Sequence, residues 1–169
     1  MKEYTDFFSE LGMLKHKKRE GWRSLGVAVP ESVADHVMRA AQIAFFIAKK
    51  EGVDPYKTAT ISLFHELGEC KLGDLDYTAK KYCSVDEERA VSDVLAIPEH
   101  DEVLSLWKDF EEKRTSEGII AKDADTIELV LQAKEYQKTG INTISFIENA
   151  KNRLMTTTAK ELYEVLNRD

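Results

Sequence analysis

The chain has 169 residues, of which 43% are hydrophobic and 33% are charged, and its formal net charge is −7. This length and composition suit one globular domain and exclude a disordered chain. The acidic balance argues against binding to nucleic-acid backbones or anionic membranes, because both need a dense field of Lys and Arg.

Helical periodicity dominates the sequence, and no segment alternates with the period of a β-strand. Asp54-Pro55 gives the clearest helix start, with Asp as the N-cap and Pro at the first helical position. Residues 15–23 are basic and expected to be irregular, and residues 69–85 are expected to form a loop with at most one short helix. We predict helices over residues 2–14, 30–50, 54–68, 86–96, 101–113, 118–139, 143–154 and 157–167.

These patterns predict an all-α fold, a single compact domain over residues 1–169 with seven to nine helices. Cys70 and Cys83 form neither a CxxC pair nor a disulfide framework, so free thiols are expected. The first residues lack the apolar core of a signal peptide, and no run of residues is apolar enough to span a bilayer. We therefore expect a soluble, cytoplasmic protein.

Two of the four histidines stand in unusual surroundings. His36 lies in an apolar helical stripe, and His65 is followed by Glu66 directly after the apolar run Ile-Ser-Leu-Phe. Burying a carboxylate is costly unless a cation or donors compensate, and a metal ion would do so. Asp125 lies in the middle of an apolar helix although Asp is a poor helix former. A hydrogen-bonded core histidine and a solvated Asp remain the simpler interpretations of each residue taken alone.

Taken together, His36, His65-Glu66 and Asp125 resemble the H…HD…D signature of the HD-domain metal-dependent phosphohydrolases. The resemblance includes the segments 30–36, 65–74 and 121–125, the run Leu-Gln-Ala-Lys-Glu-Tyr at 131–136, and Arg-Glu-Gly-Trp at 19–22. The pattern is most similar to the 5′-deoxynucleotidase branch of that family. It implies that His36, His65, Glu66 and Asp125 bind one divalent ion, with Co²⁺, Mn²⁺, Fe²⁺, Ni²⁺, Zn²⁺ or Mg²⁺ as candidates.

This chain departs from the family signature at one position, because Glu66 stands where the family has Asp. Glutamate keeps the charge and the oxygen donors but is one methylene longer, so the substitution bears on metal identity, metal affinity and rate. A carboxylate ligand can accommodate the extra length by changing its rotamer.

The resemblance also implies roles for five further residues. Glu69 and Asp74 match acidic positions suited to proton transfer, and the sequence does not assign acid and base between them. If the helix continued past His65, Glu69 would project from the same face. Arg19, Trp22 and Lys122 are candidate substrate-binding residues, although core packing is an equal alternative for Trp22 and solvent exposure is favoured for Lys122.

The implied reaction is hydrolysis of (deoxy)ribonucleoside 5′-monophosphates to nucleoside and phosphate. One alternative keeps the metal site but acts on another nucleotide or a small phosphate ester. Another is a catalytically decayed nucleotide-binding domain, which Glu66 alone favours. The last two helices carry apolar stripes that either pack on the core or form a two-fold interface, and the resembling proteins lead us to expect a homodimer.

Overall fold

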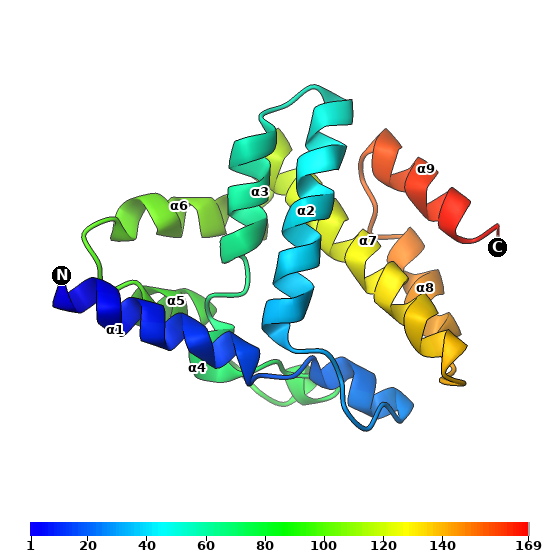
Figure 1. Cartoon of the computed structure of the whole chain (residues 1–169), viewed down its shortest axis with the longest axis horizontal. Coiled ribbons are helices and arrows are strands. Elements are labelled where there is room, and N and C mark those ends of the chain that lie inside the picture. The colour runs from blue at the N-terminus through cyan, green and yellow to red at the C-terminus, as the bar shows by residue number, and fades with distance from the viewer. Residues whose placement is uncertain (169) are drawn as a thin grey trace.

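Nine α-helices and three short 3₁₀ helices make up residues 1–168, the part of the chain that the computed structural model describes (Figure 1). The α-helices are α1 (Lys2–Leu11), α2 (Val33–Glu51), α3 (Pro55–Phe64), α4 (Glu69–Leu72), α5 (Glu87–Val94), α6 (His100–Glu111), α7 (Ser116–Lys138), α8 (Ile144–Lys151) and α9 (Thr157–Leu166). The 3₁₀ helices are Gly12–Lys15, Glu20–Leu25 and Ala79–Lys81. Within these residues there is no β-strand, so the predicted all-α fold is confirmed.

Two expectations about local structure were wrong. The segment expected to be irregular up to Arg23 contains the 3₁₀ helix Glu20–Leu25. The helix expected to reach residue 68 ends at Phe64, because the next turns tighten: the amide of Leu67 bonds the carbonyl of Phe64, and that of Glu69 bonds the carbonyl of Glu66. Such i→i+3 bonds are common where α-helices end. His65 and Glu69 therefore do not share the face of one continuous helix.

Helix α2 begins at a capping box. The Ser32 hydroxyl accepts a hydrogen bond from the amide of Asp35 at 3.1 Å, and the Asp35 carboxylate accepts one from the amide of Ser32 at 2.9 Å. Two otherwise unsatisfied amides are thus paired at the helix start. The helix ends at Gly52, whose φ of 75° favours glycine. Between these caps, His36 is among the buried residues of α2.

Helix α7 is the centre of the molecule and packs against α2, α3, α6, α8 and α9 (Figure 1). Its buried residues lie all around the helix, as expected for a helix enclosed by others. Apolar side chains of α8 and α9, among them Ile147 and Tyr163, join its core cluster. Near its start the backbone of α6 comes so close that a Cβ on Gly118 would lie 2.0 Å from the carbonyl oxygen of Asp109.

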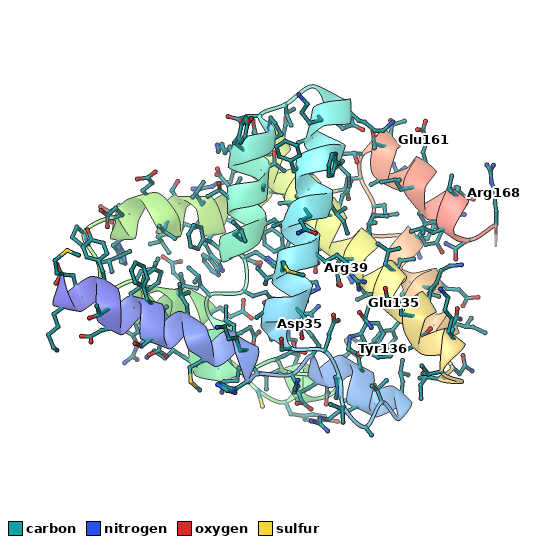
Figure 2. The ribbon with its side chains drawn as sticks, viewed as in Figure 1. Asp35, Arg39, Glu135, Tyr136, Glu161 and Arg168 are labelled. Atoms are coloured by element: carbon teal, nitrogen blue, oxygen red, sulfur yellow. The ribbon has the colours of Figure 1, made fainter. Side chains whose placement is uncertain are left out.

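Polar side chains also connect α2 to α7. Arg39 of α2 and Glu135 of α7 face each other across the two helices in Figure 2, with Nη1 of Arg39 2.6 Å from Oε1 of Glu135. None of the helices that the structure describes has both the length and the apolar character needed to cross a membrane.

Candidate metal centre

The structure brings together the four residues predicted to bind a metal, although they come from three separate parts of the chain. Ligand atoms of His36, His65 and Glu66 all lie within 4.8 Å of one another. Nε2 of His36 is 3.1 Å from Oδ1 of Asp125. Helix α2 supplies His36, the turn after α3 supplies His65 and Glu66, and α7 supplies Asp125.

The donor set fits a divalent ion. The Nε2 atoms of His36 and His65 are both buried, and neither has the geometry of a hydrogen bond. Each nevertheless faces a carboxylate, at 3.1 Å from Oδ1 of Asp125 for His36 and 3.5 Å from Oε1 of Glu66 for His65. An unpaired buried polar atom is costly, so two of them facing carboxylates require an explanation. Two imidazoles and two carboxylates are ligands that first-row divalent metals accept. His36, His65, Glu66 and Asp125 are therefore the residues that would hold the ion.

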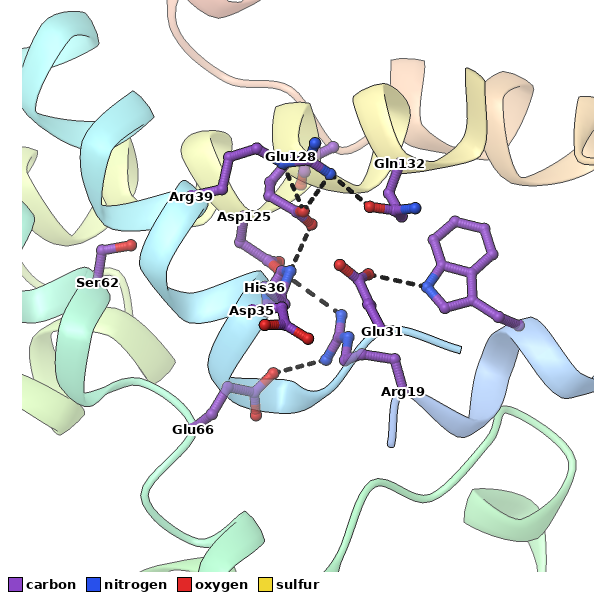
Figure 3. A network of polar contacts seen from close by, with 12 residues as sticks. Arg19, Glu31, Asp35, His36, Arg39, Ser62, Glu66, Asp125, Glu128 and Gln132 are labelled. Carbon is purple, nitrogen blue, oxygen red and sulfur yellow. Dashed lines mark hydrogen bonds and ion pairs between the residues drawn. The ribbon is translucent and has the colours of Figure 1, made fainter. Parts of the chain in front are cut away.

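Each imidazole is oriented through its other ring nitrogen. Nδ1 of His36 bonds Oε2 of Glu128, a fully buried carboxylate on α7, and Nδ1 of His65 lies 2.7 Å from the carbonyl oxygen of Ser62. Arg39 donates to Oε1 of Glu128 from Nε at 3.0 Å and from Nη2 at 2.8 Å (Figure 3). Metal-binding histidines are usually held in this way, which leaves Nε2 directed at the site.

The electrostatics match a cation site. Burial raises the pKa of Glu66, but the neighbouring His65 and Arg19 outweigh burial and hold that pKa well below its usual range. His36 and Arg19 likewise lower the pKa of Asp125 against the effect of burial. Both carboxylates are thus ionised and available as ligands at neutral pH.

Arg19 lies against two of the predicted ligands. Its Nη1 is 2.7 Å from Oε1 of Glu66, and its Nη2 is 4.0 Å from Oδ1 of Asp125 (Figure 3). Its backbone is fixed by a bridge to the segment before α2, since the Arg19 amide donates to the carbonyl of Glu31 at 3.1 Å. The backbone that carries Arg19 is therefore fixed, and Glu66 holds its guanidinium.

A cavity of about 430 Å³ opens beside the ligands and contains both acidic residues predicted to transfer protons. Burial and the charges of Glu66 and Asp74 raise the pKa of Glu69 to about 8, and Oε2 of Glu69 has no hydrogen-bond partner. Burial also raises the pKa of Asp74, whose Oδ2 accepts a hydrogen bond from the amide of Glu20 at 2.7 Å. At neutral pH Glu69 holds a proton that it can give up.

The two remaining predicted substrate residues also line this cavity, but both already have partners. Trp22 is only 3% exposed, packs against Tyr136 and Phe146, and donates from Nε1 to Glu31 at 3.0 Å. Lys122 pairs with Glu111 at 2.9 Å and lies over the Phe110 ring.

Four residues around the site were not assigned from the sequence: Glu31, Arg39, Glu128 and Arg153. Glu128 follows Asp125 by three residues, so the two share a helix face, and that spacing is the one signal that was available. Glu31 lies inside the segment 30–36 that carries the resemblance. Arg39 and Arg153 reach the site through tertiary contacts that no local pattern reveals.

Comparison with known proteins agrees with this geometry. Residues 11–166 match the HD domain, so the chain belongs to the HD-domain family. The resemblance inferred from the sequence is thereby confirmed.

Named relatives and solved structures extend the comparison. The chain is 36% identical over 151 residues to the 5′-deoxynucleotidase HDDC2 of Dictyostelium discoideum, an alignment that covers 82% of this chain and 80% of the relative. The human protein of the same name is 32% identical, with coverage of 78% and 67%. A conserved hypothetical protein from Pyrococcus furiosus has the same fold with a TM-score of 0.84 and 34% identity, covering 98% of this chain and 99% of that one.

Proposed function

We propose that this protein is a divalent-metal-dependent 5′-deoxynucleotidase, which hydrolyses deoxyribonucleoside 5′-monophosphates to nucleoside and phosphate. The observation that carries the proposal is the pair of unbonded, buried Nε2 atoms of His36 and His65, which face the carboxylates of Glu66 and Asp125 beside an open cavity. The names of the relatives in Dictyostelium and human support the substrate class.

Each part of the site has a chemical task. A divalent ion bound by the four ligands would supply charge neutralisation and activation of water. Arg19 lines the cavity beside Glu66 and would bind the phosphate oxygens, which a planar fork of donors suits. Glu69, whose pKa is raised by burial and by the charges of Glu66 and Asp74, would give its proton to the leaving 5′-oxygen.

The test is phosphate release from deoxyribo- and ribonucleoside 5′-monophosphates by metal-stripped protein resupplied with Co²⁺, Mn²⁺, Mg²⁺ or Zn²⁺. We expect metal-dependent release that favours the deoxy series. Glu66→Gln should lose at least about 100-fold in kcat/KM, because it removes an ionised ligand, while Glu66→Asp should stay within about tenfold of the parent. Absence of release with every nucleotide and metal would refute the proposal and favour another phosphate ester or a binding-only domain.

We also propose that the protein acts in the cytoplasm as a homodimer. The apolar stripes of α8 and α9 largely pack on α7, so we assign the dimer face to α2 and α3 instead. There Met38, Phe46 and Leu63 are between 49% and 68% exposed beside a groove that is mostly apolar. Light scattering after size-exclusion chromatography tests this, and Phe46→Glu should shift the mass to that of one chain.

A further inference from the structure

Arg153 is a cation of the cavity wall that comes from the connection between α8 and α9. Its Nη2 lies 3.1 Å from Oδ2 of Asp125, and its side chain is 50% exposed. The carboxylate it meets is only 11% exposed, so Arg153 approaches Asp125 from the open side of the site.

The position of Arg153 is built into the fold rather than left to a mobile loop. Asp123, which is fully buried on α7, accepts hydrogen bonds from the amide of Met155 at 2.9 Å and from the amide of Thr156 at 2.7 Å. It also accepts the hydroxyl of Thr156 at 2.6 Å, while Leu154 is buried in the core. Asp123, which precedes Asp125 by two residues on α7, therefore anchors the turn that carries Arg153.

The two oxygens of Asp125 are flanked by two guanidinium groups. Nη2 of Arg19 is 4.0 Å from Oδ1, whereas Nη2 of Arg153 is 3.1 Å from Oδ2. Arg19 is largely buried and also engaged by Glu66. Among residues 1–168 Asp125 is the one hydrogen-bond partner of the Arg153 side chain, so most of its five donors have no partner within the protein.

A phosphate monoester brings three terminal oxygens and up to two negative charges into the cavity. Arg19 cannot satisfy all of them while it also pairs with Glu66, and Lys122 is held by Glu111 at 2.9 Å. Arg153 also lines the cavity, and its side chain is half exposed and bonded only to Asp125 among the described residues. Charge-assisted bonds from a guanidinium to phosphate are among the strong hydrogen bonds of proteins.

We infer that Arg153 binds the phosphate group of the substrate, as a second arm opposite Arg19, across the proposed metal position. This inference rests on the proposed function for the identity of the substrate, but the phosphate contact itself does not require turnover. It gives Asp123 a task distinct from that of Asp125: Asp123 places the phosphate-binding arginine, and Asp125 is a ligand.

The experiment compares the parent protein with Arg153→Ala and Arg153→Lys, all saturated with Mn²⁺. Isothermal titration calorimetry gives the Kd of inorganic phosphate, and initial rates with deoxyadenosine monophosphate give KM and kcat. We expect Arg153→Ala to raise the phosphate Kd and KM about tenfold, a loss of about 1.4 kcal/mol, with a smaller change in kcat. Arg153→Lys should recover part of the affinity, because it keeps the charge but not the fork.

Arg89→Ala is the matched control, since Arg89 of α5 is exposed, pairs with Asp93, and carries the same charge away from the cavity. It should leave the Kd of phosphate unchanged. The Kd of Mn²⁺ is measured in parallel by competition with a chelator. An Arg153→Ala protein that binds phosphate within twofold of the parent would overturn the inference, as would one that loses only Mn²⁺ affinity, because Arg153 would then merely orient Asp125.

The inference and the proposed function can fail separately. A parent protein that hydrolyses no nucleotide but binds phosphate through Arg153 would refute the deoxynucleotidase proposal and leave the phosphate contact standing. A parent protein that binds no inorganic phosphate would overturn the inference, whatever its activity.

Discussion

On the α2–α7 side of the site, side chains are fixed by other side chains, whereas on the α3–α4 side backbone groups supply most of the contacts. His36 is bonded to Glu128, which accepts two hydrogen bonds from Arg39. His65 and Asp74 instead rely on a carbonyl of Ser62 and an amide of Glu20.

This difference separates two tasks. On the α2–α7 side His36 and Glu128 are fully buried and paired with each other, and Arg39 pairs with Glu128, which holds ligands at fixed positions. The α3–α4 side keeps one carboxyl oxygen of Glu69 unpaired and raises the pKa of that group, which is poor for stability and useful for proton transfer. The α2–α7 side is therefore the rigid half of the site, the α3–α4 side is its reactive half, and the two meet at the proposed ion.

The largest effect is expected where the rigid half is broken. Glu128→Gln keeps the volume at that position but removes the charge that orients His36, so we expect Mn²⁺ affinity to fall about 10- to 100-fold. Competition with a chelator measures this on metal-stripped protein, and circular dichroism verifies the fold. Glu135→Gln is the matched control, because Glu135 is the other carboxylate partner of Arg39, half exposed and without contact to His36. Equal losses in both variants would show that Arg39, not the support of His36, matters.

The sequence predicted each half to a different extent. Helical periodicity predicted α2, and the Asp54-Pro55 cap predicted the start of α3 closely, because these signals are local. It also predicted the four candidate ligands through the resemblance to a known signature. The turn that separates α3 from α4 was missed, since His-Glu-Leu-Gly at 65–68 suits a continuing helix, whereas the α-helix ends at Phe64 and i→i+3 bonds follow.

The supports of the site were harder to predict than its ligands. Arg39 and Glu128 are charged residues on two predicted helices. From the sequence, each suits a solvated helix face as well as a buried pair. Arg153 is 28 residues from Asp125 in the chain, and only the packing of the α8–α9 connection on α7 brings them together. Such contacts depend on the assembled fold, so no motif marks them.

An intermediate effect is expected on the thermal stability of the protein when Glu69, in the reactive half, is changed. The folded pKa of Glu69 is raised to about 8 from an ordinary 4.5, so the folded state binds more protons than the unfolded chain between these values. The stability of the metal-free protein should therefore fall as pH rises from about 4.5 to about 8. Glu69→Gln removes this loss, so its Tm should exceed that of the parent by a few degrees at pH 8.5, with a smaller difference at pH 5.

The control for this experiment is Glu87→Gln, which changes an exposed carboxyl at the rim of the same cavity. Its Tm should differ from that of the parent by the same small amount at both pH values. A Glu69→Gln protein with one constant Tm difference from pH 5 to pH 8.5 would contradict the raised pKa and remove the basis for its role as the acid.

The smallest effect is expected from ligand binding on the reactivity of the two thiols, which shows whether the reactive half opens. Cys70 follows Glu69 on α4, is 3% exposed, and has a thiol pKa raised to about 11 by burial, whereas Cys83 is exposed. A thiol reacts as its thiolate, so at pH 8 we expect Cys83 to react with a disulfide reagent at least about 100-fold faster than Cys70. The rate is followed by absorbance, with Cys83→Ser to isolate the slow phase.

Because Cys70 packs on the core of α5 and α6, its reaction requires α4 to separate from them. If Glu66 and Glu69 close over the ligand, saturating Mn²⁺ and phosphate should slow the reaction of Cys70 further. An unchanged rate would show that the whole reactive half has a fixed conformation, as rigid as the α2–α7 side.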